Sequence, residues 1–257
     1  MLVSRPVTTD LSLIIPCYNE SAIIGETLRA ASDYLSGLGR SYEIVVGDDG
    51  STDGTDRLVL AASEADSRVR LVRSPRNRGK GAILTSALLE GRGNILAFID
   101  ADLEIDVRTL GALLWAIDGG ADIAIGSKVI HEAWRSRPLR RRIATRGYNL
   151  LVRLLLGSPL RDHQAGIKAF RREPTRELLE SIDNPRWTWD TELLVAAQAR
   201  HLRIVEVPVT TTYQRPSKVS LLRQPLEMAS EVLRLYFAGV RTSRAPRAPR
   251  RTTSASS

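Results

Sequence analysis

Cysteine is almost absent from this sequence, since Cys17 is the only one in 257 residues. A single cysteine excludes an intramolecular disulfide and fits a reducing, cytoplasmic setting. Long apolar runs are missing too, because no uninterrupted stretch approaches the roughly 18–20 residues that a membrane-spanning helix needs. The apolar run Leu11–Ile15 is also too short for the core of a signal peptide. These absences predict a soluble or peripheral protein.

Aromatic residues are scarce, at 5% of the chain, which leaves few platforms for stacking nucleic-acid bases. The net charge of +8 nevertheless indicates an anionic partner, which is a nucleic acid, a membrane surface or a phosphorylated substrate. No nucleic-acid recognition motif accompanies this charge. The glycine patterns G-x-G-x-x-G and G-x-x-x-x-G-K-[ST] follow no predicted strand, which argues against dinucleotide-binding and P-loop sites.

Apolar runs alternate with segments of helical spacing through about residue 126, and hydrophobic residues make up 43% of the chain. This alternation predicts a Rossmann-like α/β fold, with a mostly parallel sheet covered by helices on both faces. Asn19 is the expected N-cap of the first helix. The predicted strands are 11–15, 42–46, 69–72, 95–99 and 121–125, and the predicted helices are 20–35, 53–65, 80–89 and 107–117.

The second half of the chain is less regular. We expect helices at 138–156, 189–199 and 221–240, the last interrupted near Pro225, and strands at 166–170 and 203–212. Residues 242–257 are rich in Arg, Ala, Pro, Ser and Thr and lack a core-forming pattern. This composition predicts a disordered basic tail.

Carboxylates follow two of the predicted strands, as Asp48-Asp49-Gly50-Ser51 and Asp100-Ala101-Asp102. Ligands of parallel α/β sheets bind beyond these strand ends. Adjacent carboxylates repel one another, which raises their pKa unless a cation or hydrogen bonds compensate. Mg²⁺ favours carboxylate and diphosphate oxygens, so we expect Asp102 to bind a metal with Asp100 or Glu104 assisting. The alternative is that each acidic pair is a solvated turn that caps a helix.

These motifs, together with Pro16-Cys17-Tyr18-Asn19-Glu20 and Asn77-Arg78-Gly79-Lys80-Gly81, resemble in order those of family 2 glycosyltransferases. More narrowly, they are similar to dolichyl-phosphate mannose synthases and dolichyl-phosphate β-glucosyltransferases over about residues 10–222. The resemblance implies one GT-A domain over 1–240, with a nucleotide-binding half at about 10–126, an acceptor-binding half at about 127–240 and a tail at 241–257. It also implies a UDP- or GDP-hexose donor, a polyprenyl (dolichyl) phosphate acceptor, Mg²⁺ or Mn²⁺, and inversion at the anomeric carbon.

The resemblance also implies a role for individual side chains. The expected nucleotide-sugar-binding residues are Pro16, Tyr18, Glu20, Asp49, Lys80, Asp100, Ala101, Asp102, Gln164 and Gly166. The expected metal ligands are Asp100, Asp102 and Glu104, and the expected acceptor-phosphate residues are Lys128, Arg142, Arg215 and Lys218.

Two further residues have open roles. Asp102 and Asp190 are the expected catalytic residues, but Asp190 lies in a Trp-Asp-x-Glu segment and is either a general base or a positioning group. Its structural alternatives are a helix cap or a partner of an arginine. His163 is unusual in the family motif that contains Gly166, and we expect it to be structural.

Basic residues gather in the second half, where 139–156 and 221–240 combine arginines with Leu, Val, Tyr and Phe. Basic amphipathic helices can lie in a membrane interface, so we expect peripheral contact with the cytoplasmic face of a membrane. The alternative is that these helices cover the core with their arginines in water. A hydroxyl acceptor, an inactive nucleotide-sugar-binding protein and a nucleic-acid-binding module are the rival functions. We expect no nucleic-acid partner, because that function would leave Asp100 and Asp102 unexplained.

Overall fold

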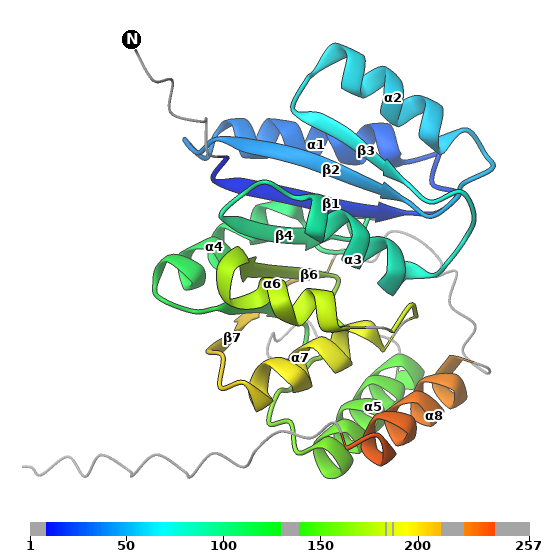
Figure 1. Cartoon of the computed structure of the whole chain (residues 1–257), viewed down its shortest axis with the longest axis vertical. Coiled ribbons are helices and arrows are strands. Elements are labelled where there is room, and N and C mark those ends of the chain that lie inside the picture. Colours follow the sequence, from blue (N-terminus) through cyan, green and yellow to red (C-terminus); the bar gives the residue numbers. More distant parts are fainter. Residues whose placement is uncertain (1–8, 130–138, 183, 187, 212–223, 240–257) are drawn as a thin grey trace, which may run out of the picture.

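The computed structural model describes residues 9–129, 139–182, 184–186, 188–211 and 224–239 (Figure 1). The strands are β1 Leu11–Cys17, β2 Tyr42–Asp48, β3 Val69–Arg73, β4 Ile95–Ile99, β5 Ile123–Ser127, β6 Ile167–Arg171 and β7 Ile204–Pro208. The helices are α1 Ile24–Ser36, α2 Thr55–Ala65, α3 Lys80–Glu90, the short 3₁₀ helix η1 Val107–Thr109, α4 Leu110–Asp118, α5 Leu139–Leu156, α6 Arg172–Ser181, α7 Trp189–Ala199 and α8 Gln224–Phe237. None of these described helices is long and apolar enough to cross a membrane.

All the strands join one sheet in the order β3-β2-β1-β4-β6-β5-β7. The sheet is parallel except for β6, which is antiparallel to both of its neighbours. The predicted α/β fold with a mostly parallel sheet is therefore confirmed. The two halves expected from the sequence share this sheet, because β6 inserts between β4 and β5.

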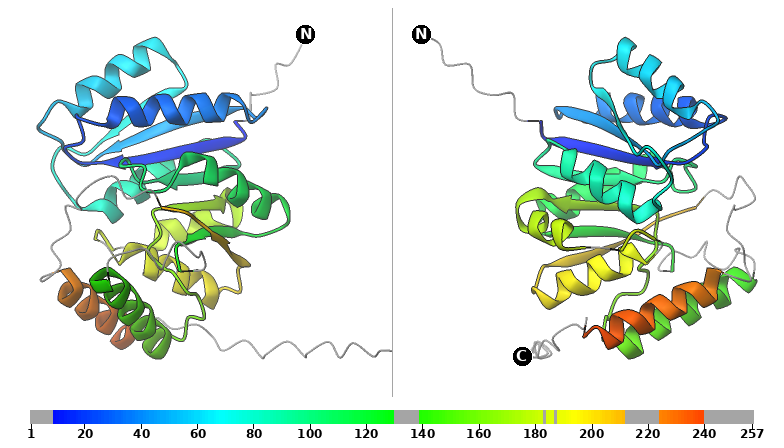
Figure 2. Two further views of the ribbon diagram at one scale, coloured as in Figure 1. Left: turned by 180° about the vertical axis from the view of Figure 1, so that it is seen from behind. Right: turned by 45° about the vertical axis from the view of Figure 1, so that its right-hand side comes forward.

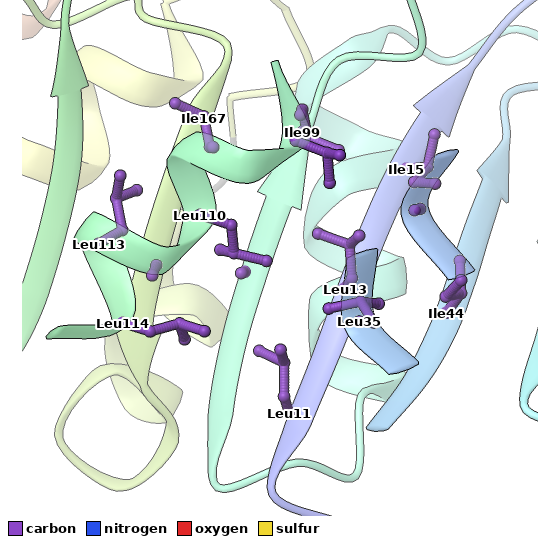
Figure 3. Packing of buried hydrophobic residues seen from close by; sticks show 14 of the residues in the cluster. Leu11, Leu13, Ile15, Leu35, Ile44, Ile99, Leu110, Leu113, Leu114 and Ile167 are labelled. Atoms are coloured by element: carbon purple, nitrogen blue, oxygen red, sulfur yellow. The ribbon is translucent and has the colours of Figure 1, made fainter. Parts of the chain in front are cut away.

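Helices cover both faces of the sheet, as continuous burial along the central strand β1 requires. Figure 1 shows α3, α6 and α7 in front of the sheet, and the rear view in Figure 2 shows α1 and α4 on the other face. The rear core packs Leu13 and Ile15 of β1 against α1 and α4, through residues such as Leu35, Leu110 and Leu113 (Figure 3). The front core surrounds Phe98, Phe170 and Trp189.

The first helix begins later than predicted, and Asn19 does not cap it. Helix α1 begins at Ile24, and Asn19 has a left-handed φ of 54°. Its Oδ1 instead accepts a hydrogen bond of 2.9 Å from the backbone N–H of Thr52. Asparagine tolerates the left-handed region better than most residues, so a tertiary bond between two loops replaces the expected cap.

Three second-half expectations change as well. Helix α6 was not predicted. It accommodates Pro174 because this residue lies in the first turn, where the missing N–H of a proline leaves no hydrogen bond unmade. Helix α8 likewise has Pro225 in its first turn rather than an interruption. Strand β7 ends at Pro208, and only an isolated bridge between Thr211 and Ile105 continues it. The predicted tail at 241–257 lies outside the described residues.

Helices α5 and α8 lie side by side beneath α7, as both views of Figure 2 show. A small cluster holds them together, formed by Val152 and Leu156 of α5, Val232 and Leu235 of α8, and Val195 of α7. The opposite face of α5 remains exposed, with Leu154 exposed over 72% of its surface. The expectation that both helices simply cover the core therefore holds for only one face of α5.

Candidate active site

The parallel strands β1, β2 and β4 end at the same edge of the sheet, which brings three sequence motifs together. The backbone N–H of Asn19 donates to Ser51 Oγ at 2.9 Å, and that of Asp49 donates to the carbonyl of Cys17 at 3.0 Å. The buried Thr27 of α1 donates its hydroxyl proton to the carbonyl of Ala101 at 2.6 Å. The acidic strand ends therefore lie at one edge of the sheet, and their shared role in one site stays a prediction.

The first motif presents its side chains differently along its length. Pro16 is buried within β1, whereas Tyr18 is 43% exposed and Glu20 is partly buried. The backbone N–H of Glu20 donates to Thr55 Oγ1 at 2.9 Å, which anchors this loop to the start of α2. An exposed phenol beside the acidic loops can stack on a base, so the nucleotide-binding role of Tyr18 stays a prediction.

Asp49 is buried and holds the loop that precedes α3. Its two carboxylate oxygens accept backbone N–H bonds from Arg78 and Gly79, each at 2.8 Å. Gly50 has a φ of 74°, and a Cβ there would lie 2.6 Å from the backbone of Arg76. The Asp49-Gly50 turn therefore packs closely against this loop and holds it by hydrogen bonds. A carboxylate has further lone pairs, so the expected contact of Asp49 with a base or ribose stays a prediction.

Lys80 is the first residue of α3, and its Nζ lies 2.5 Å from Asp100 Oδ1. Burial disfavours its charge, but the carboxylates of Asp100 and Asp190 outweigh burial and raise the pKa of Lys80 above its usual value. The flanking glycines let the chain approach 184–186 closely, since a Cβ on Gly81 would lie 2.4 Å from the carbonyl of Asn184. An amine that is protonated near neutral pH therefore faces the acidic strand end, where it can bind phosphate.

Gly166 provides the space that Asp100 occupies. Its carbonyl accepts the Asp100 backbone N–H at 2.9 Å, and a Cβ at this position would lie 2.2 Å from Asp100 Oδ2. The second-half motif thus approaches the end of β4. The direct contact of Gly166 and Gln164 with a donor sugar stays a prediction.

Asp102 is exposed at the edge of the site, and its Oδ1 accepts the Glu104 backbone N–H at 3.0 Å. Partial desolvation by the surrounding protein raises the pKa of Asp102, and the like charges of Asp100 and Glu104 raise it further. A bound cation would relieve this repulsion, so the donor set fits a divalent metal.

The expected metal ligands do not form a three-residue cluster. Within the described ranges, no group of three or more His, Cys, Asp or Glu side chains is placed to hold an ion. Asp100 is also engaged by Lys80. Mg²⁺ commonly takes one or two carboxylates and completes its shell with phosphate and water oxygens. The protein part of the predicted site would therefore be Asp102 with one neighbour at most.

Asp162 and His163 organise the second-half motif from within. Asp162 is buried and accepts the backbone N–H groups of Lys128 at 3.0 Å and Gln164 at 3.1 Å. His163 lies between Ser158 Oγ and Asn149 Oδ1, each at 2.7 Å. Burial lowers the pKa of His163 to about 4, so its ring is neutral near pH 7. The structural role expected for His163 agrees with these contacts.

Lys168 is a candidate site residue to which the sequence pattern assigns no role. Its fully buried Nζ lies 2.7 Å from Asp190 Oδ1 and donates to the carbonyl of Ala165 at 2.8 Å. Burial lowers the pKa of Lys168, and the ion pair with Asp190 opposes this shift. Asp190 therefore pairs with a lysine rather than the suggested arginine. Its place in the first turn of α7 is also favourable for a carboxylate.

The acceptor-phosphate residues are only partly described. Lys128 follows β5 and is partly exposed, and Arg142 lies partly buried on α5. Arg215 and Lys218 lie outside the described residues.

Residues 12–179 match the family model described as Glycosyl transferase family 2. The chain belongs to this family. It is 36% identical over 231 residues to glycosyltransferase AglD of Haloferax volcanii, covering 89% of this chain and 37% of that protein. It is 31% identical over 241 residues to the dolichyl-phosphate beta-glucosyltransferase of Dictyostelium discoideum, covering 88% of this chain and 74% of that protein. The chain thus spans little more than a third of the first relative.

Solved structures share the fold. A glucosyl-3-phosphoglycerate synthase from Mycobacterium tuberculosis, in complex with Mn²⁺, UDP and glucosyl-3-phosphoglycerate, has a TM-score of 0.61 at 21% identity, covering 91% of this chain and 82% of that chain. A mannosyltransferase from Pyrobaculum calidifontis, in complex with GDP-Man and Mn²⁺, has a TM-score of 0.61 at 23% identity, covering 95% of this chain and 70% of that chain. The predicted family, glycosyltransferase class and GT-A fold are confirmed.

Proposed function

We propose that this protein transfers a hexose from a UDP- or GDP-sugar to a polyprenyl phosphate, with inversion at the anomeric carbon. The observation that carries the proposal is the opposite charges at one sheet edge, where Lys80 pairs with Asp100 and is close enough to the exposed Asp102 for that carboxylate to favour its charge. A nucleoside diphosphate needs both a cationic partner and carboxylates that hold its metal. The dolichyl-phosphate glucosyltransferases among the relatives support the lipid acceptor.

The donor diphosphate would lie against Lys80, whose charge offsets the negative charge that grows on the departing nucleotide. Asp102, with Asp100 or Glu104 beside it, would hold Mg²⁺ or Mn²⁺, and this ion supplies Lewis-acid stabilisation of the same leaving group when bound. Asp49 orders the loop of Lys80, so it contributes by positioning. Tyr18, exposed nearby, would stack on the nucleobase.

The acceptor phosphate needs no general base, because a phosphate monoester is already ionised near neutral pH. One of its oxygens bonds to the anomeric carbon while the bond from that carbon to the diphosphate oxygen breaks, and no proton is transferred. Lys128 and Arg142 would pair with this phosphate, with Arg215 and Lys218 as predicted partners outside the described residues. Asp190 is neutralised by Lys168, so we assign it a positioning role.

The exposed face of α5 supplies a membrane contact for such a lipid. Its outward side chains include Leu139, Ile143, Leu150 and Leu154. Arginines on the same helix would add electrostatic attraction to anionic lipids. The position on the cytoplasmic face stays a prediction.

One assay tests the proposal. Purified protein is mixed with Mg²⁺ or Mn²⁺, polyprenyl phosphate in detergent and a panel of labelled UDP- and GDP-hexoses, and label is counted in the organic phase. Label there with one donor would establish lipid-phosphate transfer, and label only in the aqueous product would identify a soluble acceptor instead.

Replacing Asp102 with asparagine should lower transfer by about 100-fold or more, since removal of one group that stabilises the transition state typically costs this much. Asp106→Asn is the matched control, because Asp106 also accepts a backbone N–H two residues ahead, from Arg108 at 2.8 Å. Equal activity of the two variants would contradict the role of Asp102.

A further inference from the structure

A second cationic site lies along α5, apart from the acidic strand ends. It is a cavity of about 490 Å³ lined by Val129, Arg146, Asn149, Leu150, Arg153 and Arg161. This volume is within the roughly 300–1,000 Å³ of pockets that bind small molecules. The family motifs include none of its three arginines, and the proposed transfer reaction uses none of them.

The charge of the cavity favours an anion. Three of the six lining residues are arginines, and none of the six is acidic. Among the described residues, the side chains of Arg153 and Arg161 form no ion pair. The neighbouring Glu206 accepts the backbone N–H of Arg161 at 2.9 Å rather than its guanidinium. Guanidinium groups keep their charge at all physiological pH values and match phosphate oxygens in pairs.

The polar group of Asn149 is directed away from a ligand. Its Oδ1 accepts from the His163 backbone and ring, and its Nδ2 donates to the carbonyl of Thr145 at 2.9 Å. Recognition in the cavity therefore depends on the arginines and on the apolar walls formed by Val129 and Leu150.

The rim of the cavity is continuous with an apolar ridge. Leu150 lines the cavity and is 53% exposed. Residues four and eleven positions apart share one side of a helix, so Leu139, Ile143, Leu150 and Leu154 form a stripe beside Arg146 and Arg153. A ligand that combines a phosphate with an acyl chain fits this juxtaposition, because its two parts would meet adjacent surfaces of α5.

The cavity shares no lining residue with the acidic strand ends. Asn149 of the cavity contacts the fully buried His163. Three residues further along the chain, Gly166 packs against Asp100. A phosphate held by Arg153 and Arg161 would therefore contact none of the residues proposed to bind the donor.

We infer that this cavity binds the phosphodiester head group of an anionic membrane phospholipid, which holds α5 against the bilayer. The inference rests on the membrane contact in the proposed function. It adds a specific lipid site, lined by arginines that differ from the acceptor-phosphate residues.

Vesicle flotation of the full chain tests the site, with phosphatidylcholine vesicles compared with vesicles that also contain phosphatidylglycerol. The double variant R153Q/R161Q should need about tenfold more lipid for half-binding to the anionic vesicles, given the attraction of each basic residue near such a surface. The control R29Q/R200Q removes the same charge from exposed positions on α1 and after α7 and should shift binding less than about twofold.

The outcomes separate the possible errors. An equal shift for both double variants would mean diffuse charge alone and would overturn the site. So would a raised KM for polyprenyl phosphate in R153Q/R161Q, assayed in detergent, because the cavity would then serve the acceptor. The flotation needs no sugar donor, so failure of the transfer assay would leave this measurement interpretable. Unchanged circular dichroism of the variants excludes misfolding as the cause.

Discussion

Replacing Lys168 with methionine tests the buried charge pair most directly. Methionine keeps a long, flexible stem but removes the cation, so Asp190 remains in the interior without its partner. At the observed 2.7 Å, two unit charges attract by about 6 kcal/mol for an effective dielectric constant near 20. Desolvation offsets much of this attraction. Removing one partner of a buried ion pair lowers the free energy of unfolding by about 3–5 kcal/mol.

We therefore expect Lys168→Met to lower the free energy of unfolding by about 4 kcal/mol in denaturant titrations near neutral pH. Adding Asp190→Asn should restore about half of this loss or more, because no uncompensated charge then remains in the core. Contributions of independent sites add. An equal cost of Lys168→Met with either residue at position 190 would refute the coupling.

The transfer assay separates positioning by Asp190 from base catalysis. If Asp190 only positions its neighbours, Asp190→Asn lowers the rate but leaves the acidic limb of the pH profile in place. Loss of that limb in the variant would identify Asp190 as a base and would favour a hydroxyl acceptor.

Two glycine variants test the packing at the site against a matched helix position. Gly166→Ala should displace the Asp100 carboxylate, which lowers the free energy of unfolding by about 1–3 kcal/mol and reduces transfer. A Cβ on Gly147 of α5 would meet no atom within 4 Å, so Gly147→Ala should raise the free energy of unfolding by about 0.5–1 kcal/mol. Equal shifts in melting temperature for the two variants would contradict this difference. The depressed pKa of His163, about 4 against 6.5, means that the unfolded state binds more protons between these values. Stability should therefore fall by about 3 kcal/mol as pH drops through this window, and His163→Gln should flatten the dependence in denaturant titrations.

Local patterns explain why much of the fold could be predicted. The strand at Leu11–Cys17 is a mostly apolar segment that is buried throughout, and α1 presents its apolar residues at helical spacing. Because parallel strands end at a common edge, the meeting of the Asp49 and Asp102 loops also follows from the sequence. The metal-binding role expected of Asp102 rests on residue type and strand position alone, and it stays a prediction.

The missed features depend on contacts between distant residues. Lys168 and Asp190 are far apart in sequence, and they meet only because β6 runs antiparallel beside β4 and places Lys168 opposite Phe98. Asn19 has the residue type of a helix cap, yet a bond to Thr52 outweighs that preference. The local sequence around Lys168 or Asn19 does not identify the residue that each one contacts.

The insertion of β6 also bears on the order in which the chain can fold during synthesis. Until residue 171 has been made, the edge of β4 that β6 later occupies has no partner. Open strand edges invite pairing with other chains, and domains emerging from the ribosome fold as units. A fragment ending near residue 126 would expose this edge and lack the turn at Gly166. The proposed donor site and the half proposed to contact lipid must therefore fold together, and neither is a separable module for swapping between enzymes.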